Sequence, residues 1–178
     1  MHPGLDLPIG TIWWIECGFA ARAAELGRPV PEVPAVAELP STALAPGVEE
    51  IALPLGRQTW EHELHLVVAV GPELKMAPGL VFTATGRPVF GAIGEFVPQQ
   101  YGVRAALTVD GTLRQETDPA AMLWGVERLI DFLLHKHGLQ AGDLVFTGTP
   151  AGVGPVRTGD RLTATLADGS CPLHVRAD

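Results

Sequence analysis

The sequence predicts an α+β fold of many strands with two short-to-medium helices. Three observations indicate this class: frequent turn residues, several runs rich in β-branched residues, and only two segments with helical character. The chain has 178 residues, of which 21 are Gly and 16 are Pro, so short strands and turns are favoured over long helices. This length suits one domain, 1–178. We expect a helix and a proline-rich segment over 1–45 and the β core over 46–178.

The first helix is predicted over residues 17–26, where alanine is frequent, and Gly27 is a typical residue just past a helix end. The prolines of 27–58 forbid a regular helix and predict an extended segment over the surface. Strands are predicted at 65–70 and 79–86, because both runs are rich in β-branched residues.

Two hairpins are predicted from turn dipeptides, Asp110-Gly111 and Asp168-Gly169, which suit backbone positions with positive φ. The segment 143–154 predicts a strand that runs into a glycine-rich turn.

The longer helix is predicted to begin with Asp118 as N-cap and Pro119 as its first residue, and to end at Gly138. Its apolar residues recur at helical spacing: Met122, Val126, Leu129, Ile130, Leu133 and Leu134.

Charge and composition exclude some functional classes. The net charge is -8 and there is no cluster of Lys and Arg, which argues against binding to nucleic acid or to an anionic membrane. The N-terminus has no signal-peptide pattern and no apolar run reaches the length of a membrane span. We therefore expect a cytoplasmic protein in which Cys17 and Cys171 are reduced.

The glycine-rich turn at 147–154 reads "TGTPAGVG", which offers backbone N–H groups and hydroxyls for an anion but lacks a nucleotide-binding pattern. Taken alone, an ordinary turn and an anion site both remain open. In its context, 141–162, the turn resembles the C-terminal region of the fumarylacetoacetate hydrolase family. The segments 109–134 and 23–44 also resemble parts of that family, in the same order along the chain.

The resemblance implies a mixed β-sandwich or β-roll that is usually a homodimer and acts on small 2-oxo acids or 1,3-dicarbonyl acids. The family's reactions are C–C bond hydrolysis, decarboxylation, isomerisation and hydration. A divalent metal, usually Mg²⁺, holds the substrate's carboxylate and 2-oxo oxygen, and so stabilises an enolate.

The family's metal strand usually reads Glu-x-Glu-Leu, and the two ligand positions fall here on Glu63 and His65 in "WEHELHLVVAVG". Because alternate strand residues share a face, Glu61 joins these two as a third candidate ligand. An imidazole ligand also suits Mn²⁺ or Zn²⁺ better than Mg²⁺. The alternative is an edge strand with a solvated polar face.

The family's third metal ligand, an aspartate, and its lysine have no counterpart between Gly71 and Phe90, where the chain is shorter. The family's His-x-x-Glu dyad falls on Arg22 and Glu25. Arginine cannot act as a base in proteins, so Glu25 or water would have to supply that chemistry. Arg22 could instead bind a substrate carboxylate, or form an i,i+3 ion pair with Glu25.

Thr149 falls on the threonine of the family's Gly-Thr-Pro turn, which faces the substrate carboxylate, and Thr147 and Gly148 match as well. Gln115 occupies a polar position after the first hairpin and is a further substrate-binding candidate. Two functions remain open: a divergent metal-dependent enzyme for a small 2-oxo acid, or a scaffold of the same fold that has lost turnover and serves in binding or assembly.

Overall fold

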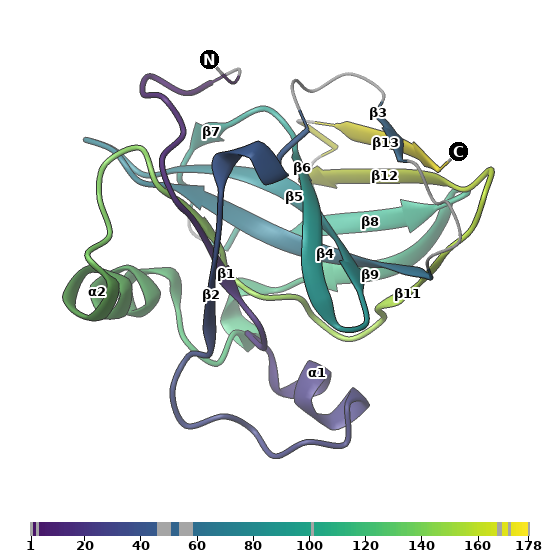
Figure 1. Cartoon of the computed structure of the whole chain (residues 1–178), viewed down its shortest axis with the longest axis horizontal. Coiled ribbons are helices and arrows are strands. Elements are labelled where there is room, and N and C mark those ends of the chain that lie inside the picture. Colours follow the sequence, from purple (N-terminus) through teal and green to yellow (C-terminus); the bar gives the residue numbers. More distant parts are fainter. Residues whose placement is uncertain are drawn as a thin grey trace.

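The structure is a computed structural model that describes residues 2, 4–45, 51–53, 59–100, 102–166, 169–170 and 172–177, with the backbone alone for 51–53. Two β-sheets share one apolar core, and two α-helices lie outside them (Figure 1). This arrangement confirms the predicted α+β class.

The larger sheet has eight strands and provides the frame for the polar cluster described below. Its central path runs in the order β2-β1-β10-β4-β5-β6, with β11 paired to β4 and β7 paired to β5. β1 runs parallel to β10, and the other pairs in this sheet are antiparallel. The strands are β1 (Ile12–Ile15), β2 (Val36–Leu39), β4 (Trp60–Ala69), β5 (Lys75–Ala84), β6 (Arg87–Ile93), β7 (Val97–Pro98), β10 (Leu144–Phe146) and β11 (Gly154–Val156).

The smaller sheet has five strands in the order β3-β13-β12-β8-β9. They are β3 (Ile51–Leu53), β8 (Ala105–Val109), β9 (Thr112–Thr117), β12 (Arg161–Leu166) and β13 (Leu173–Ala177). The turn between β8 and β9 has positive φ at Asp110 (50°) and Gly111 (75°), as the dipeptide predicts. β12 and β13 pair antiparallel around the second predicted turn, where Gly169 has φ 81° and Asp168 lies outside the described residues.

β4 is buried on both faces, which explains its long apolar run. Leu64 and Leu66 belong to the core that the two sheets share. Val67 belongs to a second cluster on the other face, with Phe146 of β10 and, at its edge, Ile9 of the N-terminal segment. Strand alternation therefore places His62 on the side of the smaller sheet, and Glu63 and His65 on the opposite side.

The longer helix, α2 (Val126–His137), ends at Gly138 in the left-handed conformation, as predicted, but its predicted start is wrong. Asp118 caps the 3₁₀ helix η2 (Pro119–Ala121) by accepting a hydrogen bond from the Ala120 N–H, and α2 begins only after Gly125. The chain between them is held elsewhere: Met122 forms a bridge with Phe19, the Leu123 N–H donates to Gly18 O, and Trp124 is buried. These long-range contacts outweigh the local helical pattern.

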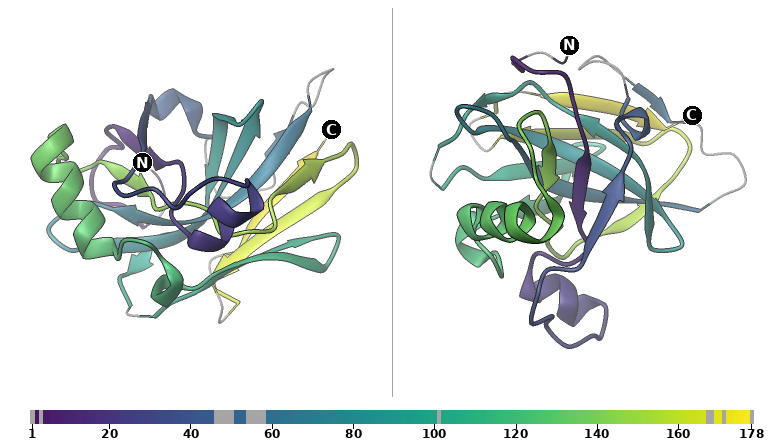
Figure 2. Two further views of the ribbon diagram at one scale, coloured as in Figure 1. Left: turned by 90° about the horizontal axis from the view of Figure 1, so that it is seen from below. Right: turned by 60° about the vertical axis from the view of Figure 1, so that its left-hand side comes forward.

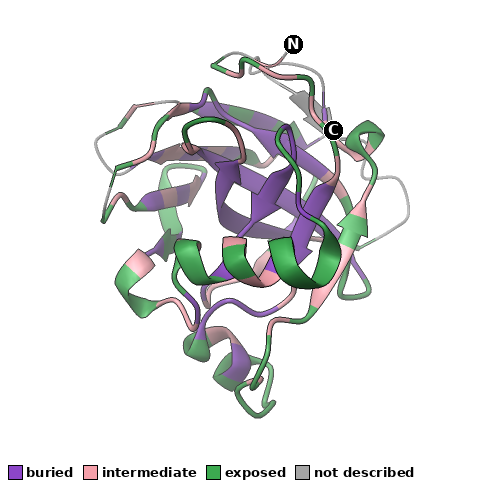
Figure 3. Cartoon of the chain, turned by 90° about the vertical axis from the view of Figure 1, so that its left-hand side faces the viewer, coloured by how far each residue is buried: buried purple, intermediate pink, exposed green. Residues whose placement is uncertain are grey.

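Figure 3 shows that the outer surface of α2 is largely exposed while the strands behind it are buried. Leu129 and Leu133 pack into the core, but Leu134, which the spacing places on the apolar face, is 50% exposed. The buried stripe of α2 is thus narrower than the sequence predicts.

The N-terminal segment supplies two strands of the larger sheet. β1 was not predicted; its only local signal is four consecutive apolar residues. β2 lies at the sheet edge within the proline-rich stretch, which also contains the 3₁₀ helix η1 (Ser41–Ala43). The short helix α1 (Ala20–Glu25) begins three residues later than predicted and lies well apart from α2 (Figure 2).

Within the described parts of the chain, no helix is long and apolar enough to cross a membrane. Cys17 is a buried free thiol, and Cys171 lies outside the described residues.

Candidate functional site

Two of the predicted site residues of β4, Glu63 and His65, form a buried polar cluster on the side of the larger sheet that faces α1. Glu63 is 4% exposed and His65 is fully buried. Opposite them on β5 lie Val81 and Gly79, so the neighbouring strand contributes no polar side chain at these two positions. Glu63 and His65 must therefore find their partners elsewhere, since an unpaired buried polar group costs free energy.

The hydrogen bonds of His65 fix the protonation of its ring. The Gly148 backbone N–H donates to Nδ1 at 3.2 Å. A backbone N–H can only donate, so Nδ1 carries no proton and the neutral ring holds its proton on Nε2. Nε2 lies 3.2 Å from Glu63 Oε2 and donates to it. Edge contact with the Phe146 ring, at a centroid distance of 5.6 Å, further holds the imidazole in place.

The helix α1 brings a cation to this cluster. Arg22 Nη2 lies 3.6 Å from Glu63 Oε1, and Nη1 forms the i,i+3 ion pair with Glu25 that the spacing suggests. Glu25 Oε1 in turn accepts a hydrogen bond of 2.9 Å from the Gly152 N–H. The Arg22 side chain is only 11% exposed, and its Nε is buried without a hydrogen-bond partner among the described residues. Arg22 and Glu25 therefore connect α1 both to β4 and to the glycine turn.

Gly148 can only be glycine, because of its conformation and its surroundings. Its φ is 104°, which disfavours any side chain, and an added Cβ would lie 2.5 Å from the backbone of Gly18. This close approach brings the chain before α1 against the glycine turn, with the Gly148 N–H directed at His65.

Thr147 anchors the turn to the sheet. Its hydroxyl and its N–H both approach Leu66 O, at 2.8 and 3.2 Å. The hydroxyl that was expected to contact substrate is thus used within the fold.

Gln115 of β9 connects the two sheets through four hydrogen bonds. Its Nε2 donates to Thr149 Oγ1 (2.9 Å) and to Pro150 O (3.1 Å). Its Oε1 accepts from the Leu64 N–H (3.0 Å) and from His62 Nδ1 (3.1 Å). Gln115 is thus the residue that positions the Thr149 hydroxyl. Thr149 accepts this hydrogen bond, and no described residue accepts the proton of its own hydroxyl.

His62 is a site residue that the sequence interpretation passed over. Its only local signal was its place between two glutamates, and it lies on the opposite face of β4 from them. It is 2% exposed. Burial lowers the pKa of the imidazole, and the hydrogen bond with Gln115 offsets this effect in part.

A divalent metal does not fit the side chains as they are arranged. Among the described residues, no group of three or more His, Cys, Asp or Glu side chains is placed to hold one. A ligand nitrogen needs a free lone pair, whereas Nδ1 of His65 faces the Gly148 N–H and Nε2 carries the proton. The predicted set of Glu61, Glu63 and His65 is therefore not assembled. A guanidinium, that of Arg22, is the cation beside Glu63.

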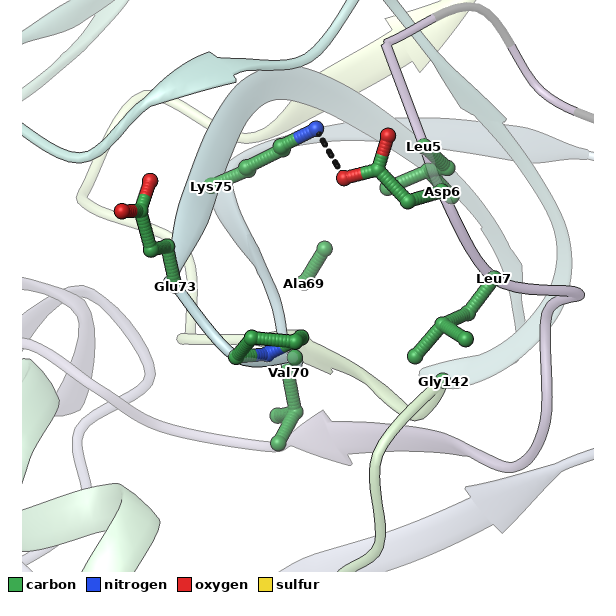
Figure 4. Close-up of a pocket in the computed structure, with 10 residues that line it drawn as sticks. Leu5, Asp6, Leu7, Ala69, Val70, Glu73, Lys75 and Gly142 are labelled. Carbon is green, nitrogen blue, oxygen red and sulfur yellow. Dashed lines mark hydrogen bonds and ion pairs between the residues drawn. The ribbon is translucent and has the colours of Figure 1, made fainter.

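A small cavity at the turn between β4 and β5 is separate from this cluster (Figure 4). Its volume is about 20 Å³, and its lining is largely apolar. Lys75 reaches across it to Asp6 at 2.7 Å and also donates to Gly4 O. Lys75 therefore links β5 to the N-terminal segment. None of the predicted site residues lines this cavity.

The comparison with protein families decides the identification. Residues 75–176, more than half of the chain, match the model described as fumarylacetoacetate (FAA) hydrolase C-terminal. The chain belongs to the fumarylacetoacetate hydrolase family.

This family member is 29% identical over 207 positions to an oxaloacetate tautomerase of Escherichia coli (strain K12), with 96% of this chain and 94% of the relative covered. A mitochondrial oxaloacetate tautomerase of Homo sapiens is 28% identical over 201 positions, covering 89% and 91%. Both alignments are longer than the 178 residues of this chain, so both relatives contain segments that this family member lacks.

Among solved structures, fumarylpyruvate hydrolase from Pseudomonas aeruginosa, in complex with Mn²⁺ and pyruvate, superposes with a TM-score of 0.84. The two chains are 27% identical, and the match covers 99% of this chain and 94% of the other. The predicted β-roll of the family is thereby confirmed.

Proposed function

We propose that this protein binds a small 2-oxo acid or 1,3-dicarbonyl acid between α1 and the glycine turn, and that it transfers a proton between the keto and enol forms. The observation that carries the proposal is the Arg22 guanidinium, which belongs to a side chain only 11% exposed and lies beside both Glu63 and Glu25. Two relatives named as oxaloacetate tautomerases support the choice of reaction.

Arg22 and Thr149 would bind the substrate. The guanidinium suits a carboxylate because its N–H groups form two parallel hydrogen bonds. A substrate carboxylate would replace Glu25 at Nη1 and release Glu25 from its ion pair. The Thr149 hydroxyl, oriented by Gln115, would donate to a substrate oxygen.

Glu25 would then be the base. Its side chain is 33% exposed and, once released, can remove the proton from the carbon next to the 2-oxo group. The C–H electron pair becomes the C=C bond, and the carbonyl oxygen becomes an enolate that Arg22 stabilises as a fixed cation. Return of the proton from Glu25 to that oxygen completes the enol. His65 and Glu63 hold Arg22 in place and exchange no proton in this scheme.

Tautomerisation needs fewer functional groups in the site than the family's other reactions do. Hydrolysis and hydration need an activated water, and the dyad that would activate it is Arg22 and Glu25 here. An enolate stabilised by a metal needs a ligand set that the described side chains do not assemble. A proton transfer needs one carboxylate and one cation, and both are present on α1.

The test is the approach of oxaloacetate to its keto–enol equilibrium, followed by the absorbance of the enol in the presence of a chelator. We expect catalysis that survives chelation. Arg22→Gln should raise KM, with kcat/KM lower by about 10-fold or more for a lost charge-assisted contact. Glu25→Gln should lower kcat with a smaller effect on KM. The control is Glu32→Gln, which changes an exposed carboxylate of the proline-rich segment.

Metal analysis of the protein after dialysis against Mn²⁺, Mg²⁺ and Zn²⁺ gives an independent readout. Stoichiometric metal, lost in Glu63→Ala, would contradict a metal-free site.

A scaffold without turnover is the second candidate. It is favoured by the fact that Glu25, Glu63 and Arg22 are all paired within the chain, so the fold does not need a ligand at this place. Binding of oxaloacetate or oxalate without any change in the tautomerisation rate would support it and would exclude the enzymatic proposal. We also propose a homodimer, by the family resemblance, which light scattering coupled to gel filtration tests.

A further inference from the structure

A polar cleft lies on the other side of β4 from Glu63 and His65. Its volume is about 340 Å³, and its walls come from β4, the β8–β9 hairpin, β11 and the chain that follows β11. The side chains that matter for its chemistry are His62, Arg114, Arg157, Asp110 and Asp160. None of them takes part in the cluster around Arg22.

His62 presents a hydrogen-bond acceptor to this cleft. The orientation of the Gln115 amide is fixed, because its Nε2 donates to the carbonyl of Pro150. Its Oε1 must therefore accept from His62 Nδ1, so the neutral ring carries its proton on Nδ1 and a lone pair on Nε2. No described residue forms a hydrogen bond to Nε2. A residue that is only 2% exposed thus directs one acceptor, unpartnered among the described residues, into the cleft.

Gly154 leaves this acceptor accessible. A Cβ on Gly154 would lie 3.3 Å from His62 Nε2, and Gly154 is not in the positive-φ region that strains other residues. The glycine is thus not required by the backbone conformation, but its lack of a side chain keeps Nε2 open to the cleft.

Two arginines supply positive charge at the same cleft. Arg114 lies on β9 and Arg157 directly after β11; both are exposed, and neither forms an ion pair with the described acidic residues. The two aspartates of the lining are already engaged: Asp110 accepts from the Arg161 N–H at 3.1 Å, and Asp160 from the Arg157 N–H at 2.8 Å. Both aspartates keep their negative charge, so the two guanidinium groups bring the formal charge of the lining to zero (+2 and -2) in a chain whose net charge is -8. Both guanidinium groups stand beside the buried imidazole, where they can pair with an anion.

We propose that this cleft is a second binding site, for a small hydroxycarboxylic acid. The carboxylate groups of the ligand bind Arg114 and Arg157, and its hydroxyl donates to His62 Nε2. A guanidinium pairs with carboxylates in a planar, two-pronged geometry, while the neutral imidazole nitrogen selects for a ligand that carries a hydrogen-bond donor. The proposal is independent of the function proposed for the site at Arg22.

The test is calorimetric titration of the full chain with malate and with succinate, which share two carboxylates and differ by the hydroxyl. We expect malate to bind about fivefold more tightly, as one added hydrogen bond of about 1 kcal/mol would give. The variant with Arg114→Gln and Arg157→Gln should bind both acids at least about 10-fold more weakly. Gly154→Ala should lower the affinity for malate to that for succinate, and it should leave the affinity for succinate unchanged.

Two controls separate this site from the others. Arg87→Gln removes an exposed arginine of β6 that does not line the cleft, and should leave both affinities unchanged. Arg22→Gln removes the cation of the first site, so malate binding that persists in this variant belongs to the cleft. The proposal would be overturned if neither acid binds, or if malate and succinate bind with equal affinity. It would also be overturned if Arg22→Gln abolishes malate binding while the variant with Arg114→Gln and Arg157→Gln preserves it. Thermal unfolding of every variant confirms that it is folded.

Discussion

Replacement of Gln115 by Ala tests the connection between the two sheets. Gln115 is 2% exposed and its amide satisfies two buried backbone groups, the Leu64 N–H and Pro150 O, besides two side chains. A buried backbone group left without a partner costs about 1–3 kcal/mol. Two such groups predict a loss of about 2–6 kcal/mol in the free energy of unfolding, out of the roughly 5–15 kcal/mol typical of a domain.

The assay is urea unfolding followed by circular dichroism, with Gln115→Ala compared with Gln100→Ala. Gln100 is exposed, so its truncation should change the free energy of unfolding by less than about 0.5 kcal/mol. If Gln115→Ala lowers the free energy of unfolding by less than about 1 kcal/mol, the amide is not needed to satisfy these two backbone groups. Water or a local shift would then replace the lost hydrogen bonds at little cost.

Three further outcomes are expected. Gly148→Ala should lower the melting temperature more than Gly159→Ala, since both glycines have positive φ but only Gly148 would press a Cβ against Gly18; equal shifts would argue against that contact. Burial lowers the pKa of His62 below 6.5, so its contribution to the free energy of unfolding should be complete above pH 6.5 and decline as the pH falls below that value. The free energy of unfolding, measured by urea titration at several pH values, should fall more steeply with decreasing pH in the wild type than in His62→Gln. The same pH dependence in both proteins would contradict this role of His62. Burial raises the pKa of Cys17, so the native thiol should react slowly with a disulfide reagent, as the difference between wild type and Cys17→Ser would reveal.

Several of the β elements follow from local signals in the sequence. The Asp110-Gly111 turn and the Gly138 helix end depend on residues that are neighbours along the chain, and both are found where the sequence predicts them. β4 is found as a strand, but it begins at Trp60, ahead of the start predicted at His65. The i,i+3 pair of Arg22 and Glu25 is likewise a matter of local spacing. Residue type and short-range geometry are sufficient for such features, because a helix or strand fixes the distances involved.

The start of α2 and the chemistry of the site depended on contacts between distant residues. Nothing near Asp118 signals that Met122 and Leu123 pair with residues before α1, and this pairing delays the helix. Nothing near His65 signals that a backbone N–H some eighty residues later occupies Nδ1 and directs the ring proton to Glu63.

The amino-acid sequence alone indicates the family, the strand that carries the polar cluster, and the absence of an aspartate between Gly71 and Phe90. Which groups meet is visible only in the folded chain: Arg22 lies against Glu63, Glu61 does not join Glu63 and His65 in a metal site, and His62 opens onto a separate cleft. The physical reason is that protonation, charge pairing and access to a ligand are set by the nearest atoms in space, and in a β-roll these come from strands far apart in the chain.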